Sequence, residues 1–378
     1  MFRHNAFLHS LNVIVLSGVG GFLLSLTGIS IGWMIGALLA ATILSLRYGK
    51  QQDESPVPHI GIPKYWMAVG QCMLGIELGR KMNSTFFFTF QDHWLTISTM
   101  LLLSIVFALL SGLILWKFTK LDLLTSFFAA APGGLSTIPG IAEELGANTG
   151  VVSIAQTMRI FLVVLTIPVI LSFSMGPPVE AVPELSASVS PPFQMGHIWG
   201  TALLVGIAWF GYFFGRFVKF PAPWLLGSMV SVALLQMVST IFLNAELQAW
   251  WPSGMIVISQ VLIGTSIGSR IHRSMFQGLK KIVFFSMVST IFLIFTMFLS
   301  AYLASLLTDL PFITTALAFS PGGISEMTTT SIVLGGDSTF VLAVQVLRVI
   351  AVCVILPPLF KLIQYWEMKK NAHEHQSA

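Results

Sequence analysis

Charge is scarce in this chain. Only 9% of its 378 residues are charged and 55% are apolar, whereas a soluble domain carries charge on about a quarter of its residues. The Lys and Arg residues lie singly or in pairs at the ends of apolar runs, and they form no continuous basic surface for nucleic acid. The composition therefore excludes a soluble domain. It predicts an all-α polytopic protein whose partner is the lipid bilayer, with no nucleic acid bound.

Metal ligands and catalytic motifs are also few. Cys72 and Cys353, the only two cysteines, both lie inside apolar segments, so neither a disulfide framework nor a cysteine metal site is expected. The eight histidines lie at segment ends or in loops, and the tail sequence His373-Glu-His375 is a weak metal signal. No nucleophile elbow, phosphate-binding loop or aspartate-rich box occurs. We expect no enzyme, no metal and no cofactor other than Na+ or H+ as a coupling ion.

The apolar segments form two similar series. They fall near residues 7–27, 31–46, 63–79, 94–116, 121–146 and 150–172, and again near 197–215, 222–243, 252–269, 282–306, 312–336 and 338–360. Between the series lies a stretch that is rich in Ser and Pro and lacks Lys and Arg. We therefore divide the chain into a first membrane repeat at 1–172, a linker at 173–196, a second repeat at 197–363 and a polar tail at 364–378.

Matching residues indicate that the two series are an internal duplication. Pro132-Gly-Gly pairs with Pro321-Gly-Gly, and 321 − 132 is 189. At the same offset Gln71, Gly75, Gly79, Gly146, Gln156, Arg159 and Pro168 recur as Gln260, Gly264, Gly268, Gly335, Gln345, Arg348 and Pro357. Trp33-Met-Ile-Gly36 recurs as Trp224-Leu-Leu-Gly227, two residues out of step. The two Gly-x-x-x-Gly pairs predict faces for close helix packing.

The fifth segment of each series is interrupted by Pro-Gly-Gly. The limb that precedes the interruption, such as 312–320, is about ten residues long and reaches roughly the bilayer midplane, ~15 Å deep. If each broken segment is a re-entrant hairpin, the two repeats are inverted, and nearly all Lys and Arg residues fall on the cytoplasmic side, with only Arg80 and Lys81 outside. If each broken segment crosses, the repeats are parallel and the charges divide almost evenly. We favour two inverted repeats, each of about five transmembrane helices plus a broken or re-entrant hairpin, with both termini cytoplasmic.

Each interruption predicts a binding site. The limb after it begins with unpaired amides that suit an anion, at Gly133 and Gly134 and at Gly322 and Gly323, and Ser136 and Ser325 would orient the anion. The limb before it ends in carbonyls that suit Na+, at Ala130, Ala131, Phe319 and Ser320. The alternative is that Pro-Gly-Gly serves only a tight turn or close helix packing.

Charged and amide side chains in the following segments add to this site. The pairs Gln156/Arg159 and Gln345/Arg348 share a helix face, and an arginine inside the membrane requires either a function or a structural partner such as the carbonyls freed at the break. The two alternatives for these arginines remain open.

Acidic residues differ between the repeats. Glu326, beside the second break, is the first candidate for ion coupling, and Glu77 is the second. Asp337 and Asn148 are expected to cap the helices that follow them, while Glu143 and Glu144 are expected to be solvated.

These motifs also carry a resemblance. Trp-Met-Ile-Gly36, Gly-Ile-Glu-Leu-Gly79, the two Pro-Gly-Gly motifs and the two Gln-x-x-Arg motifs resemble the AbrB family of duplicated bacterial membrane proteins. Its members carry labels such as ammonia monooxygenase or regulator, and neither label defines site residues. The small DNA-binding regulator that shares the name has no counterpart in this sequence. More distantly, Ser-Pro-Gly-Gly-Ile-Ser-Glu326 and Leu-Gly-Gly-Asp337 are similar to the core of bile-acid/sodium symporters and of the cation/proton antiporter and anion transporter group, which implies broken helices that meet at the membrane midplane.

We therefore expect a secondary transporter of a small, anionic organic solute in the bacterial cytoplasmic membrane. Na+ or H+ would drive it, and the substrate site would lie between the two breaks. The alternative is a membrane-embedded regulator or sensor of gene expression that binds a ligand without moving it. Whether the chain forms a homo-oligomer stays open.

Overall fold

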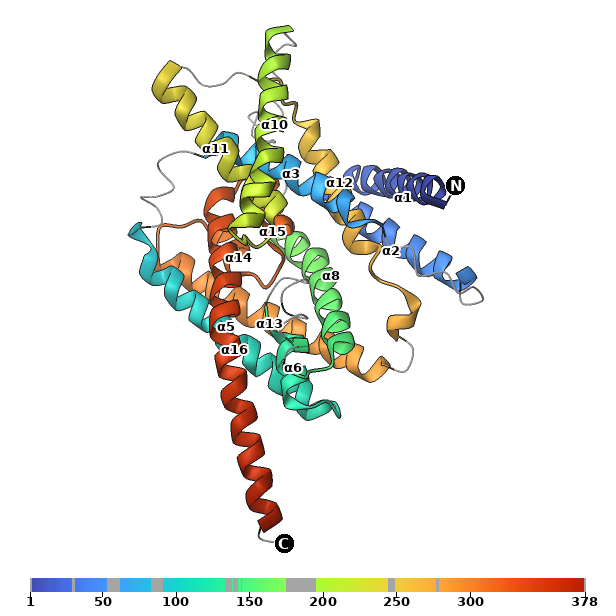
Figure 1. Cartoon of the computed structure of the whole chain (residues 1–378), viewed down its shortest axis with the longest axis vertical. Helices are drawn as coiled ribbons and strands as arrows, with labels where there is room; N and C mark the ends of the chain where they lie inside the picture. The colour runs from blue at the N-terminus through green and yellow to red at the C-terminus, as the bar shows by residue number, and fades with distance from the viewer. Residues whose placement is uncertain are drawn as a thin grey trace. The chain divides into compact units, whose positions relative to one another are not determined.

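The structure is a computed structural model. It describes residues 2–28, 31–52, 62–82, 91–132, 138, 142–143, 145–174, 195–243, 249–276 and 279–376. All regular elements in this part of the chain are helices (Figure 1). Their order repeats, as the two series of apolar segments predict.

The helices match the predicted segments closely. The first series gives α1 (Phe2–Ser25), α2 (Gly32–Gln52), α3 (Lys64–Lys81), α5 (Trp94–Phe118), α6 (Leu123–Ala130) and α8 (Thr149–Ser174). The second gives α10 (Met195–Phe217), α11 (Pro223–Leu243), α12 (Gly254–Gly268), the short 3-10 helix η1 (Arg273–Phe276), α13 (Lys280–Leu307), α14 (Phe312–Phe319), α15 (Ile324–Leu334) and α16 (Ser338–Gln376).

The break in the second repeat is confirmed. Helix α14 ends at Phe319, and α15 begins at Ile324 after Pro321, Gly322 and Gly323. Proline supplies no backbone donor and glycine disfavours the helix, which explains the position of the interruption. In the first repeat α6 ends at Ala130, and the segment 133–137 lies outside the described residues.

The polar tail, for which no secondary structure was predicted from the sequence, is helical. Helix α16, the long helix that leads to the C-terminus in Figure 1, continues through this tail to Gln376. After Pro358 the sequence contains no Pro or Gly, and Lys, Glu, Gln and Ala are good helix formers. Local propensity therefore extends the helix beyond the apolar segment.

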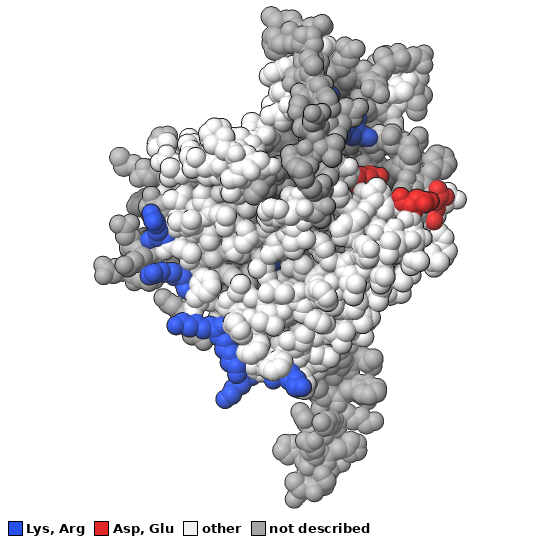
Figure 2. Space-filling model, turned by 180° about the vertical axis from the view of Figure 1, so that it is seen from behind, with Lys and Arg blue, Asp and Glu red and all other residues white. Residues whose placement is uncertain are grey.

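The helices have the composition of a membrane protein. Seven of them are long and apolar enough to cross a bilayer, and α2 and α12 contribute shorter apolar helices at Gly32–Arg47 and Gly254–Gly268. Large apolar side chains are exposed along them, including Trp199 at 81% and Phe217 at 86% on α10. Among the described residues on the face shown in Figure 2, most are uncharged. A helical membrane protein places such side chains against lipid.

The chain forms two compact units. Unit 1 contains residues 1–92, 164–274 and 324–342, and unit 2 contains 93–163, 275–323 and 343–378. Both repeats contribute to each unit. The break of the second repeat falls at a boundary, since α14 belongs to unit 2 and α15 to unit 1.

Unit 1 is held together by helices that touch through glycine. A Cβ on Gly36 of α2 would lie 2.3 Å from the carbonyl oxygen of Gly20 in α1, and a Cβ on Gly227 of α11 would lie 2.2 Å from that of Gly211 in α10. These contacts are equivalent in the two repeats, because 211 − 20 and 227 − 36 are both 191. The offset is that of the Trp33 and Trp224 motifs.

The predicted Gly-x-x-x-Gly faces pack reciprocally between the repeats. In α3, Cβ atoms on Gly75 and Gly79 would each lie 2.6 Å from a backbone oxygen of α11. In α12, Cβ atoms on Gly264 and Gly268 would lie 2.4 and 2.2 Å from backbone oxygens of α2. Helices α3 and α12 also touch each other, where the Ser259 hydroxyl donates to the carbonyl of Gly70 at 2.8 Å. The packing role predicted for these glycines is confirmed.

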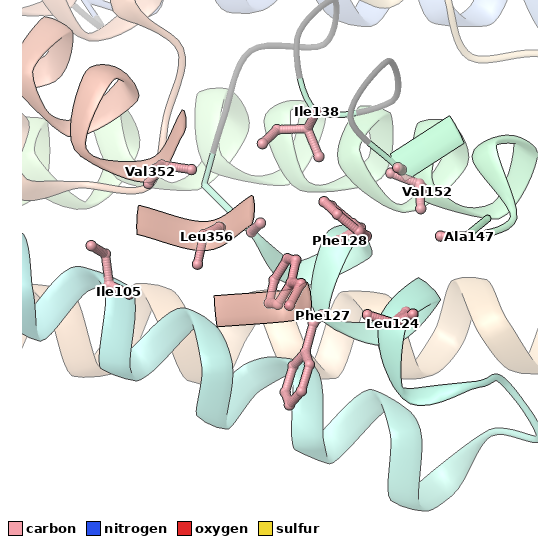
Figure 3. Packing of buried hydrophobic residues seen from close by; sticks show 12 residues of the cluster. Ile105, Leu124, Phe127, Phe128, Ile138, Ala147, Val152, Val352 and Leu356 are labelled. Atoms are coloured by element: carbon pink, nitrogen blue, oxygen red, sulfur yellow. The ribbon is translucent and has the colours of Figure 1, made fainter. Parts of the chain in front are cut away.

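Unit 2 has an aromatic core beside the first break. Figure 3 shows Phe127 and Phe128 of α6 packed with Val352 and Leu356 of α16. The ring of Phe360 in α16 stacks on Phe127 with centroids 5.7 Å apart and meets Phe128 edge-on at 4.5 Å. The end of the second repeat thus fixes the first limb of the break in the first repeat.

Candidate functional site

Gln345 of α16 binds the end of α14, just before the second break. Its Nε2 donates to the carbonyl oxygens of Leu317, Ala318 and Ser320 at 2.8, 3.2 and 3.2 Å. The last carbonyls of a helix have no partner within that helix. The glutamine side chain supplies one, and it is fully buried.

Arg348 lies one turn further along α16 and completes this cap. Its Nη1 donates to the carbonyl of Ser320, and its Nη2 donates to the carbonyl of Gly322 at 2.7 Å and to Gln345 Oε1 at 2.6 Å. The guanidinium therefore faces the negative end of the α14 helix dipole, where a positive charge is favoured.

The first repeat contains the same arrangement on α8. Gln156 Nε2 donates to the carbonyls of Phe128 at 3.0 Å and Ala131 at 3.5 Å. Arg159 Nη1 donates to the carbonyls of Ala130 at 3.1 Å and Ala131 at 2.7 Å. In each repeat a Gln-x-x-Arg pair thus caps the helix that precedes the break.

The two caps use equivalent carbonyls. Phe128 and Ala131 accept from Gln156, and Leu317 and Ser320 accept from Gln345. The differences 317 − 128 and 320 − 131 both equal 189. The duplication seen in the sequence therefore extends to the hydrogen bonds of the site.

These contacts bear on the cation expected at the break. The carbonyls of Ala130, Ala131 and Ser320, interpreted from the sequence as ligands for Na+, accept hydrogen bonds from arginine. A guanidinium occupies the place that a cation would need, and like charges repel. The structural alternative for the arginines, bonding to the freed carbonyls, is the arrangement observed.

The hydrogen bonds to the carbonyls do not neutralise the positive charge of the two arginines. Arg159 and Arg348 are each only 3% exposed, and they are close enough for their charges to repel. In the described part of the chain neither forms an ion pair with a carboxylate. The Nε atoms of both arginines are buried without a hydrogen-bond partner. A buried charge is costly unless it is compensated, so unit 2 holds positive charge that its own described residues do not balance.

Glu326 lies in unit 1, in the first turn of α15. It is 3% exposed, its carboxylate interacts with the hydroxyl of Ser325, and it is attracted by the charge of Arg270. Gln71 of α3 in turn donates from Nε2 to Ser325 Oγ at 3.5 Å. A carboxylate beside the positive end of a helix is favourably placed. The next residues of α15 that carry hydroxyl groups, from Thr328 to Ser331, are also buried.

Glu77 has a different environment. Its carboxylate lies 2.8 Å from the ammonium of Lys81, one turn later on α3. The side chain of Lys81 is 55% exposed, while that of Glu77 is 10% exposed. The second coupling candidate therefore has a counter-ion in direct contact near the end of its helix.

The remaining polar predictions have simple outcomes. Asn148 Oδ1 accepts from the amide of Val151 at 3.1 Å, and Asp337 Oδ1 accepts from that of Phe340 at 2.9 Å, so both predicted caps are confirmed. Glu143 is exposed, as expected. Four predicted positions, Gly133, Gly134, Ser136 and Glu144, lie outside the described residues, and Gly323 follows Gly322 in the break without a described side-chain contact.

Two residues that interact with Ser325 or Glu326 were not predicted from the sequence. Gln71 was predicted only as one of the repeated positions, and Arg270 was assigned no role. The recurrence of Gln71 as Gln260 was a usable signal, because a glutamine inside an apolar segment needs a polar partner. No local pattern connects Arg270 with Glu326, since 56 residues separate them and only the fold brings them together.

The described helices are consistent with a helical membrane protein, and its buried capping pairs recur at a constant offset of 189 residues. Comparison with known proteins gives its family. The family described as "Transition state regulatory protein AbrB" matches residues 33–364. The chain belongs to this family, as its repeated motifs indicated.

Two relatives show how far the likeness extends. The chain is 46% identical over 361 residues to "Uncharacterized protein YhjN" of Bacillus subtilis (strain 168), which covers 95% of this chain and 94% of the relative. It is 22% identical over 346 residues to "Putative regulator AbrB" of Escherichia coli (strain K12), covering 90% and 92%. The similarity spans both repeats in each case.

Proposed function

We propose that this protein is a secondary transporter of a small organic anion in the bacterial cytoplasmic membrane. One observation carries the proposal. Two arginines on equivalent helices are buried beside two helix ends, and the described residues provide no carboxylate to balance them. A positive charge at membrane depth without a protein counter-ion is well suited to a transient anionic ligand. A non-enzymatic role fits this site, which is built from capping groups.

The proposed topology has two inverted repeats and cytoplasmic termini. The distribution of Lys and Arg supports it. Reciprocal packing also supports it, because α3 packs on α11 as α12 packs on α2. Two halves related in this way can exchange equivalent conformations, and this exchange is the basis of alternating access in many transporters.

Glu326 is the proposed coupling residue. It is the buried carboxylate beside the break, it interacts with Ser325, which accepts from Gln71, and the charge of Arg270 attracts it. Protonation would remove its attraction to Arg270, so the charge state of α15 would change with the driving ion. Because arginine caps the carbonyls before the break, we favour H+ over Na+ as that ion.

Proteoliposomes test the proposal directly. The purified protein would be given radiolabelled lactate, propionate, succinate, citrate and glutamate under an imposed pH or Na+ gradient. We expect accumulation of at least one anion above its external concentration under the pH gradient. Glu326→Gln should abolish accumulation but retain exchange, and Arg348→Ala retaining full uptake would remove that arginine from the substrate's site.

A membrane-embedded regulator is the second candidate, and the name of the Escherichia coli relative favours it. A sensor would bind the same anions without accumulating them under any gradient. Saturable binding together with equilibration only, in the same proteoliposomes, would support the sensor and contradict the transporter.

A further inference from the structure

The charge in unit 2 can be counted from its described residues. Arg159 and Arg348 each contribute one full positive charge, because arginine does not lose its proton in proteins. Each caps the carboxyl end of a short helix, α6 or α14, and such an end carries about −0.5 of a charge. The pair therefore retains roughly one positive charge in total. No Asp or Glu among the described residues of unit 2 is buried with them.

The unused hydrogen-bonding atoms specify more than a charge. Three buried polar atoms beside the caps have no partner: Nε of Arg159, Nε of Arg348 and Oε1 of Gln156. The two Nε–H groups are donors, and the amide oxygen is an acceptor. Gln156 and Arg159 lie one turn apart on α8, so their groups belong to one face of that helix.

From this set we propose that unit 2 binds a monovalent organic anion with one hydrogen-bond donor of its own, a hydroxy monocarboxylate in chemical class. The two carboxylate oxygens accept from Arg159 and Arg348, and the hydroxyl donates to Gln156 Oε1. A single negative charge balances the net charge of the pair, whereas a dianion would leave an uncompensated negative charge in the membrane interior. This inference rests on the proposed anion site and defines its ligand.

The two repeats contribute differently to this ligand. In the second repeat the amide oxygen of Gln345 accepts from Arg348 at 2.6 Å and is not available. In the first repeat the amide oxygen of Gln156 has no such bond. Among the described residues, the near-symmetric pair of caps therefore offers one acceptor, so the ligand needs one donor and binds in one orientation.

Thermal unfolding of the purified full-length protein tests this, because a ligand of the folded state raises the melting temperature by mass action. The probes are the sodium salts of lactate and glycolate, of propionate, and of succinate and sulfate, all compared with sodium chloride at equal ionic strength. We expect lactate to stabilise saturably and to bind about two- to tenfold more tightly than propionate, which lacks one hydrogen bond. Succinate and sulfate should not exceed the chloride control.

Substitutions test whether the ligand binds at Arg348. Arg348→Lys keeps the charge but lacks Nε–H, and it should weaken lactate binding about tenfold or more. The matched control is Arg273→Lys, an exposed position of η1 in unit 1, which should bind as the parent does. Should Arg348→Lys fail to fold, the comparison of lactate with propionate on the unaltered protein still decides.

Three outcomes separate this inference from the proposed function. Equal or greater stabilisation by succinate, or no stabilisation by any monocarboxylate beyond chloride, would overturn the ligand class. Binding of lactate without accumulation in proteoliposomes would leave the ligand class intact and contradict transport. Accumulation of a dianion with no monocarboxylate binding would support transport and contradict the ligand class.

Discussion

Units 1 and 2 contain matching pieces of both repeats, yet different contacts hold their helices together. In unit 1 the helices approach until backbone meets backbone, because glycine removes the side chain at each contact. In unit 2 side chains make the key contacts, because glutamine and arginine donate to the backbone carbonyls that the break leaves without helical partners.

This difference indicates which substitutions should destabilise each unit. Adding one methyl group should damage unit 1, and removing one side chain should damage unit 2. It also indicates where the ligand chemistry lies, since close glycine contacts offer no functional groups and the capped breaks offer buried charge and unpaired donors.

Arg348→Ala should have the largest effect. The change leaves the carbonyl of Gly322 and the Oε1 of Gln345 buried without their donor, whereas the carbonyl of Ser320 keeps its bond from Gln345. An unsatisfied buried polar group costs about 1–3 kcal/mol. Two such groups predict a loss of about 2–6 kcal/mol in the free energy of unfolding, measured by denaturation in detergent. The control Arg273→Ala removes an exposed arginine and should be nearly silent. Equal stability of the two variants would contradict the capping role.

Gly268→Ala should follow in unit 1. Its Cβ would lie 2.2 Å from the Leu38 carbonyl oxygen and 2.9 Å from Ala41 Cβ, so α2 and α12 must separate. Overpacking of this kind costs about 1–3 kcal/mol. Gly206→Ala on α10 is the control, because nothing lies within 4 Å of that Cβ. Melting temperatures of both variants check the prediction, and an unchanged value for Gly268→Ala would show that the helices can adjust.

Removing the amino-terminal caps should have smaller and matched effects. Asn148→Ala and Asp337→Ala each delete the side chain that accepts from the first amides of α8 or α16. Loss of such a cap costs about 1 kcal/mol. Thermal unfolding should show similar shifts in both variants, since the two residues are counterparts in the repeat. A much larger shift for Asp337→Ala would assign it a role beyond capping.

Lys81→Ala should have the smallest effect. Its ion pair with Glu77 joins residues one turn apart, and the lysine side chain is 55% exposed. Pairs of this kind contribute about 0–1 kcal/mol. The same denaturation measurement should therefore find little change. Loss of ion-driven uptake in this variant, with stability retained, would return Glu77 to the coupling site.

Much of the fold could be predicted from the sequence. Long apolar segments fix the helices, and Pro321 with Gly322 and Gly323 fixes the break between α14 and α15. The glycine faces were predictable because Gly-x-x-x-Gly is a local pattern with one physical use. No secondary structure was predicted for the polar tail, although Lys, Glu, Gln and Ala favour the helix that continues to Gln376.

The candidate site was predictable in part. The sequence identified Gln156, Arg159, Gln345 and Arg348 as polar groups that need partners inside a membrane. It could not choose between a ligand and the freed carbonyls, since both alternatives satisfy the same cost. The interaction of Glu326 with Arg270 was not predictable at all, because it depends on how α15 packs near the end of α12.

The sequence by itself determined two similar series of long apolar helices with Pro-Gly-Gly interruptions at equivalent places, because hydropathy, proline and glycine act locally. Only the tertiary structure decided which carbonyls the arginines cap and which atoms remain unpaired, because those contacts join residues 25 to 29 positions apart. Side-chain direction and helix packing settle such contacts, and neither can be read from a linear pattern.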